Sequence, residues 1–248
     1  MTSGIKNILN SVFIMYFVSI LSLNSTYINY ANIFRSNELN NVSDKILLAE
    51  IPKSNIYLYA LDSQKDIEEN GEYRKIVLEV DGKKKNFSWH VDIGESFKAK
   101  LILSDINNDG IEELFVIITT ASGTGVNTQQ VSLFNIKKIS EIEVLDPLKA
   151  ISKNIKTKLN KKDGNIDFKI DIKGNTSEIV LKESSSSLWF DNAYFGNYIN
   201  YNVIDNKLIA EVGVQLSATL YVGVIRVEYI FKNNVLEPNN IVFEKFNN

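Results

Sequence analysis

A short polar loop between two apolar strands constrains the fold of this chain more than any other stretch of its sequence. Apolar runs at 101–103 and 114–118 flank a loop with side-chain oxygens at its first, third, fifth and ninth positions. These oxygens belong to Asp105, Asn107, Asp109 and Glu113, with Gly110 at the sixth position and the backbone carbonyl of Ile111 at the seventh. Ca²⁺ takes about six to eight oxygen ligands, and glycine permits the sharp turn that aims them inward. The loop therefore predicts a calcium site.

The loop resembles the calcium loops of the VCBS and FG-GAP repeat families, whose pattern is D-x-D/N-x-D-G-x-x-D/E between two apolar strands. The match holds at Asp105, Asn107, Asp109, Gly110 and Glu113, and the resemblance covers residues 101–120. The resemblance implies that Gly110 is the turn residue and that the other four residues are calcium ligands. It also implies an extracellular or cell-surface protein. Tandem copies build β-propeller blades in some of these families. We find one copy here, so a propeller closed by repeated blades is not expected.

An ordinary turn is the alternative interpretation of the same loop. Asn108, Asp109 and Gly110 form a strong hairpin turn by themselves, because such residues tolerate positive φ. A plain turn does not require oxygens at 105 and 113, and this favours the cation. An EF-hand is excluded, because its twelfth position would be Val116, where that motif needs a bidentate glutamate.

Composition excludes several classes of function. A net charge of -3 and a pI near 5.4 provide no basic field for phosphate backbones, so nucleic acid is not an expected partner. The absence of cysteine excludes disulfides, thiolate zinc sites and cysteine nucleophiles. The single histidine, His90, falls on the polar face of an alternating segment, so a serine nucleophile has no evident base. These absences favour a binding or structural protein over an enzyme and leave the question of an enzyme open.

The first 31 residues are typical of an export segment. Lys6 precedes an apolar stretch at 12–23, which is shorter than the roughly 20 residues of a membrane span. A cleavable signal is favoured, and contact with a membrane is expected only through this segment if it is retained. Residues 32–50 are a polar linker in this interpretation. The expected location is extracellular or at the cell surface.

The remaining sequence predicts a mainly β, β-rich α+β fold of about ten antiparallel strands and meanders. Asp146 and Pro147 are typical of a helix start, and apolar residues at helical spacing extend to Leu159. One amphipathic helix is thus predicted at 147–159. The chain divides into a half that contains the calcium loop, 51–146, and a helix plus β-meander half, 147–248. With 44% hydrophobic residues we expect the two halves to pack as one unit.

An aromatic stretch at 188–201 is the other candidate for function. Five of its residues form a candidate ligand surface, namely Trp189, Phe190, Asp191, Tyr194 and Tyr198. Aromatic rings among polar residues can stack on a carbohydrate or a protein, or they can pin a loop onto the core. The sequence thus predicts an exported, calcium-stabilised binding or structural module. The alternative is an extracellular hydrolase or accessory factor that acts on polysaccharide or cell wall, with Asp191 as one of its two carboxylates.

Overall fold

The computed structural model describes residues 45–94, 99–183 and 188–246, which belong to one compact unit of the chain, Ser43–Asn248. The predicted export segment and most of the predicted linker lie outside the described residues. The described part is mainly β, with antiparallel-rich sheets and two short helices, as the sequence predicted for its class. None of the described helices is long and apolar enough to cross a membrane.

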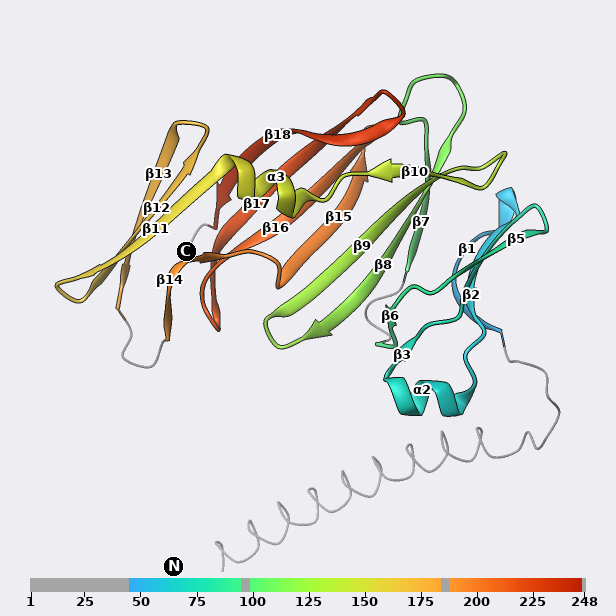
Figure 1. Ribbon diagram of the computed structural model, residues 1–248, viewed down its shortest axis with the longest axis horizontal. Coiled ribbons are helices and arrows are strands. Elements are labelled where there is room, and N and C mark those ends of the chain that lie inside the picture. The colour runs from blue at the N-terminus through green and yellow to red at the C-terminus, as the bar shows by residue number, and fades with distance from the viewer. Residues whose placement is uncertain (1–44, 95–98, 184–187, 247–248) are drawn as a thin grey trace, which may run out of the picture. The chain divides into compact units, whose positions relative to one another are not determined.

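The largest sheet has nine strands (Figure 1). They are β7 (Lys100–Ser104), β8 (Glu113–Gly123), β9 (Val126–Asn135), β10 (Ser140–Val144), β14 (Trp189–Tyr194), β15 (Tyr198–Ile204), β16 (Lys207–Ser217), β17 (Leu220–Lys232) and β18 (Val235–Lys245). Their order is β10-β18-β17-β16-β15-β9-β8-β7, and β14 pairs with the end of β16. Strand β10 also pairs with β9, so β9, β15, β16, β17, β18 and β10 form a closed ring of paired strands. Strand β8 pairs with the other edge of β9.

Smaller sheets complete the fold. A four-stranded sheet has the order β1-β2-β4-β5, with a short 3₁₀ turn after its first strand, and β3 pairs with β6. The elements are β1 (Ile46–Ile51), η1 (Pro52–Ser54), β2 (Ile56–Ala60), β3 (Glu72–Tyr73), β4 (Ile76–Val80), β5 (Lys83–Phe87) and β6 (Val91–Asp92). Strand β1 occupies residues that the sequence analysis assigned mostly to the linker.

The central strand β8 is shared by two hydrophobic cores. Leu114, Val116 and Ile118 belong to a core with the four-stranded sheet, which we call the second core. Phe115 and Ile117 point the other way, into the larger first core that contains most of the main sheet. All five side chains are at most 2% exposed. Strand β8 is therefore covered on both faces, as its continuous apolar run requires.

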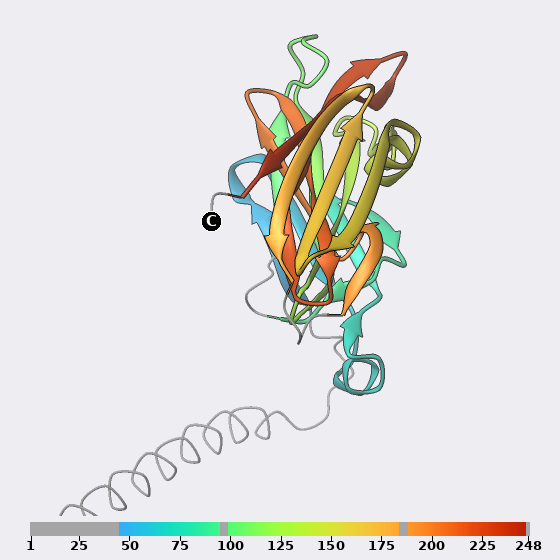
Figure 2. The same ribbon diagram turned by 90° about the vertical axis from the view of Figure 1, so that its left-hand side faces the viewer.

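A three-stranded sheet adds buried side chains to the first core. It consists of β11 (Ile155–Lys162), β12 (Asn165–Ile172) and β13 (Asn175–Lys182), in yellow and orange at the front of Figure 2. Phe168 and Ile170 of β12 are fully buried in that core. Strands β12 and β13 form a hairpin, with its turn at Lys173 and Gly174, both of which have positive φ.

The predicted helix at 147–159 is wrong in its second half. Helix α3 covers Pro147–Asn154 and begins as predicted, with the Asp146 side chain accepting the Leu148 N–H. Residues from Ile155 onward form β11, which pairs with β12 along its whole length. Ile155 and Leu159 fit both helical spacing and the period of two of a strand, and pairing with β12 decides for the strand.

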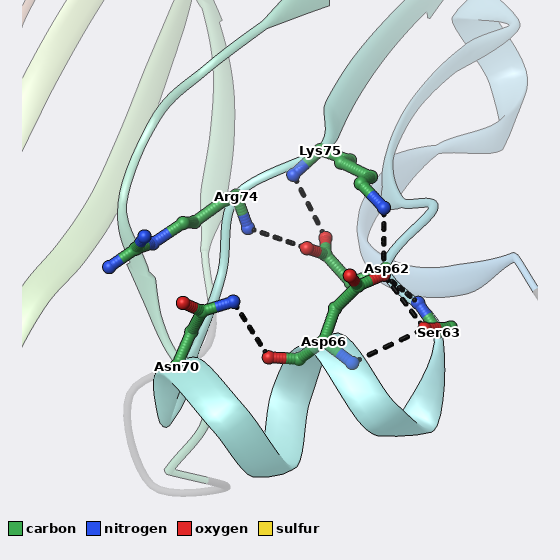
Figure 3. A network of polar contacts seen from close by, with 6 residues as sticks. All are labelled: Asp62, Ser63, Asp66, Asn70, Arg74 and Lys75. Carbon is green, nitrogen blue, oxygen red and sulfur yellow. Dashed lines mark hydrogen bonds and ion pairs between the residues drawn. The ribbon is translucent and has the colours of Figure 1, made fainter.

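A second helix, α2 (Gln64–Asn70), lies in a polar stretch for which the sequence predicted no element. Ser63 and Asp66 form a reciprocal capping box at its start (Figure 3). Asp66 also forms an ion pair with Lys75 at 2.7 Å, and these contacts hold the pKa of its carboxyl well below the usual range. Asp62, only 3% exposed, accepts the backbone N–H groups of Arg74 at 3.0 Å and Lys75 at 2.9 Å. The network joins the helix to the start of β4.

Candidate metal centre

The predicted calcium loop connects β7 to β8. These strands are antiparallel, and their last pair is Ser104 with Glu113. The two ends of the loop are therefore held together by the sheet, and Glu113 is both the ninth loop position and the first residue of β8. Asn108 and Gly110 have φ values of 58° and 83°, in the left-handed region that asparagine and glycine tolerate. Asn108 and Gly110 therefore allow the chain to reverse its direction within the loop.

The outer part of the loop is organised by backbone N–H groups that point at side-chain oxygens. The carboxylate of Asp105 accepts the N–H groups of Asp109 and Gly110, each at 3.0 Å. The Asn107 Oδ1 atom also accepts the Asp109 N–H, at 2.8 Å. Asp109 in turn accepts the Ile111 N–H at 2.8 Å. Three of the predicted ligands are thus wrapped around one turn.

Glu113 closes the inner side of the loop. Its side chain is buried, at 1% exposure, and its Oε2 accepts the Ile106 N–H at 3.2 Å. Its Oε1 accepts the Asn107 Nδ2 at 3.1 Å, and the same Nδ2 lies 3.1 Å from Asp109 Oδ2. The structure therefore brings all four predicted side chains into one hydrogen-bonded cluster, which we call the acidic loop cluster: Asp105, Asn107, Asp109 and Glu113.

The charge of this cluster is unbalanced. Burial raises the pKa of Glu113 above its ordinary value of 4.5, and the negative charges of Asp109 and Asp105 raise it further. The Ile106 N–H acts in the opposite direction. Among the described residues, no lysine, arginine or histidine forms an ion pair with any of the three acids. A buried carboxyl group thus lies beside two others with only N–H groups to stabilise it.

The donor set fits a hard cation. Carboxylate and amide oxygens suit Ca²⁺, whereas zinc prefers imidazole and thiolate. In the described residues, however, no group of three or more His, Cys, Asp or Glu side chains is arranged to hold a metal ion. The oxygens of the acidic loop cluster face N–H groups rather than a common centre, and Ile111 participates through its N–H. The Ile111 carbonyl stays a predicted ligand.

The ordinary-turn alternative explains part of this geometry. The N–H contacts at Asp109, Gly110 and Ile111 are those of a tight polar turn. A turn of this kind gives no reason to bury Glu113 within the range of two further carboxylates, since burying a charge without a partner is unfavourable. Glu113 is thus the residue that separates the two interpretations.

The residues of the predicted aromatic surface lie partly in the core and partly at the surface. Trp189 packs against the first core, and its Nε1 is buried without a hydrogen-bond partner among the described residues. Asp191 is exposed, and Tyr194 on the same strand is 49% exposed. The ring of Phe190 lies edge-on to that of Tyr194, with centroids 6.4 Å apart. The stretch therefore contributes both to the core and to the surface.

One aromatic residue of this surface comes from a distant part of the chain. Tyr221 of β17 lies edge-on to Tyr198, with centroids 6.3 Å apart, and donates its hydroxyl to the Gly125 carbonyl at 2.7 Å. Its ring covers Gly213, where a Cβ atom would lie 2.6 Å from Tyr221 Cε1. No local signal in the sequence places Tyr221 beside Tyr198, because strand pairing brings them together.

Comparison with known proteins adds no further assignment. No protein-family model matches this chain, and neither a curated protein nor a solved structure matches it.

Proposed function

We propose that this chain is an exported binding or structural module of the extracellular space or cell surface, stabilised by Ca²⁺ at the acidic loop cluster. The observation that carries the proposal is the burial of Glu113 beside Asp105 and Asp109. A divalent cation supplies the positive charge that these three carboxylates lack among the described residues. Asp105, Asn107, Asp109 and Glu113 are the side chains that would hold it.

The position of the loop supports a structural role for the cation. Glu113 begins β8, the strand that both cores share, and Ile106 of the loop is buried in the first core. A cation that fixes Glu113 and the Ile106 segment would therefore stabilise the packing on both faces of β8. The ligand of such a module would be a carbohydrate or a protein, with the exposed ring of Tyr194 and the half-buried ring of Tyr198 as the candidate surface.

Thermal unfolding with and without calcium tests this function. If Ca²⁺ binds only the folded state, the free energy of unfolding should rise by about 2.7 kcal/mol at a hundredfold excess over Kd. Extracellular modules often have Kd values of about 10⁻⁴ to 10⁻³ M, so millimolar Ca²⁺ is the appropriate range. Mg²⁺ should stabilise less, because it demands a tighter octahedron and dehydrates reluctantly.

Two variants make the experiment specific to the loop. Asp109→Ala should abolish the stabilisation by calcium, whereas Glu112→Ala should retain it, since Glu112 is an exposed acid of the same loop outside the cluster. If calcium leaves the melting temperature of the wild type unchanged, or raises that of Asp109→Ala equally, the loop is an ordinary turn. The export part of the proposal has a separate test, which is N-terminal sequencing of protein recovered from the culture medium. An intact Met1 in a cytosolic fraction would contradict it.

A further inference from the structure

Strand β13 has a free edge. The three-stranded sheet has the order β11-β12-β13, so β13 pairs with β12 on one side and with no described strand on the other. The opposite margin of this sheet is covered, because β14 lies beside β11 and the Ala193 N–H donates to Thr157 Oγ1 at 3.2 Å. The pairing of β13 with β12 runs from Asn175 to Lys182 without a bulge. A continuous strand of 8 residues thus presents one unpaired edge.

The hairpin fixes which backbone groups point to this edge. The Glu183 N–H donates to the Gly164 carbonyl at 2.9 Å, a bond that flanks a pair whose two residues do not bond each other, here Asn165 and Lys182. Hydrogen-bonded and non-hydrogen-bonded pairs alternate along an antiparallel ladder. Four residues of β13 therefore direct their N–H and C=O groups away from β12, namely Thr176, Glu178, Val180 and Lys182.

The side chains of these four residues lie on the exposed face of the strand. Val180 is 67% exposed, whereas its neighbour Ile179 is buried in the first core. Natural sheets protect their free edges with charged residues, proline or bulges, and edge strand β5 does so with lysines at 83–85. Strand β13 has neither proline nor bulge, and its exposed valine lies between two residues of opposite charge, Glu178 and Lys182. This edge is therefore open to pairing with another strand.

The two charges are placed symmetrically about Val180. In an antiparallel pair of two β13 strands, residues that point to the edge must face residues that do the same, which limits the possible registers. When Val180 faces Val180 of a second copy, Glu178 of each copy faces Lys182 of the other, and Ile179 faces Leu181 on the core side. The adjacent registers place a charged residue opposite Val180, and the next ones place like charges opposite each other, which is destabilising. One register thus satisfies both charges.

We propose that β13 is a dimerisation edge, at which two copies of this chain pair antiparallel about a two-fold axis through Val180. The pairing joins two three-stranded sheets, forms about six backbone hydrogen bonds and packs the two Val180 side chains together. Within one chain Glu178 forms an ion pair with Lys169, and Lys182 forms none among the described residues. Lys182 is therefore available to Glu178 of the second copy. The dimer does not involve the acidic loop cluster, so either proposal can fail without the other.

Sedimentation equilibrium of the full chain measures the association. A single pair of strands is a small interface, so we expect a reversible dimer with a Kd on the order of 10⁻⁵ to 10⁻⁴ M. The average mass should rise from 28.1 kDa towards twice that value as the protein concentration increases through this range. A mass that stays at 28.1 kDa up to about ten times the upper Kd would overturn the proposal.

Two charge variants test the register. Glu178→Lys and Lys182→Glu each place like charges opposite each other, so each should weaken self-association about tenfold. A mixture of the two variants should associate within about threefold of the wild type, because each charge then faces its opposite. Lys158→Glu is the control, since Lys158 is exposed on β11 of the same sheet, and it should associate like the wild type. A mixture that associates no better than either variant alone would refute the two-fold pairing.

A single added cysteine locates the axis, because the chain contains none. Residues of a hydrogen-bonded pair have Cα atoms about 5.5 Å apart, which is within the range of a disulfide. Val180→Cys should therefore give a disulfide-linked dimer under mild oxidation. Thr176→Cys is the matched control, since Thr176 is exposed on the same strand but would lie about 27 Å from its equivalent in the second copy. Equal cross-linking of the two variants would contradict an axis at Val180.

Discussion

The Nδ2 atom of Asn107 lies 3.1 Å from Oε1 of Glu113 and 3.1 Å from Oδ2 of Asp109, so one uncharged amide bridges two carboxylates. An amide N–H₂ group neutralises much less charge than a divalent cation does. The stability of the loop should therefore depend on whether a cation or only this amide is present. The first two predictions follow from that dependence.

Replacing Asn107 with aspartate should lower the stability of the protein without calcium and increase its stabilisation by calcium. Asn107→Asp removes the bridging donor and adds a fourth carboxylate, so the variant in chelator should be less stable by about 1–3 kcal/mol. With millimolar Ca²⁺ the loss should be recovered, because the added carboxylate is a better ligand. Asn108→Asp is the control, since Asn108 adds the same charge at an exposed neighbouring position. Melting curves that show equal losses with and without calcium would contradict the prediction.

The calcium effect should depend on pH through Glu113. The pKa of this residue is raised above 4.5, so without a cation the folded state is favoured below that value and loses stability as pH rises through the raised pKa. Calcium requires the ionised carboxylate and reverses the trend. The rise in melting temperature with calcium should therefore be largest near neutral pH and disappear as pH falls through the raised pKa. Melting temperatures in metal-free buffers from pH 4 to 8 provide the reference. Glu113→Gln should reduce the pH dependence of the melting temperature both with and without calcium.

Asp62 should be important for joining α2 to the four-stranded sheet. It is buried and accepts two backbone N–H groups, from Arg74 and Lys75. Asp62→Ala removes both hydrogen bonds, and because Arg74 and Lys75 are themselves exposed, the free energy of unfolding should fall by about 0.5–1.5 kcal/mol for each bond. Asp62→Asn retains one acceptor oxygen and should lose less. Denaturant unfolding of the three proteins is the measurement, and equal stability of the alanine and asparagine variants would argue against this role.

The two cores should unfold together because they share β8. Trp89 packs against the second core and Trp189 against the first, so each tryptophan reports on one core. Single-tryptophan variants, Trp89→Phe and Trp189→Phe, should show the same denaturant midpoint after correction for their own stabilities. Phe115→Ala should lower that common transition by about 3–5 kcal/mol. Two separate midpoints in either variant would mean that β8 does not couple the cores.

Gly213 should tolerate no side chain. A Cβ atom there would lie 2.6 Å from the Tyr221 ring and 2.9 Å from Tyr198 Cβ, so Gly213→Ala should displace the Tyr221 ring and destabilise the fold by about 1–3 kcal/mol. Gly123→Ala is the matched control, because no atom lies within 4 Å of its added Cβ. Thermal unfolding of the two variants is the measurement, and a loss of equal size in both would contradict the packing argument.

Several features could be predicted from the sequence because they depend on neighbours along the chain. The turn at Asp205–Asn206 uses residues that tolerate positive φ, and the apolar run of β8 requires cover on both faces. The start of α3 at Pro147 depends on the preceding Asp146 cap. The loop residues Asp105, Asn107, Asp109 and Glu113 converge because their spacing and Gly110 impose a tight turn. The cation site that their oxygens suggest is therefore a prediction from the sequence alone.

Other features were decided only by contacts between segments that are distant in the sequence. Helix α3 ends at Asn154 because β12 offers Ile155 and the residues after it a strand partner. Tyr221 reaches Tyr198 only through the pairing of β17, β16 and β15, and β10 and β15 pair with different parts of one edge of β9. Local residue patterns determined most of the strands and where the oxygens of the acidic loop cluster gather. Strand pairing, which depends on long-range backbone hydrogen bonds and shared burial, determined which surfaces those strands create.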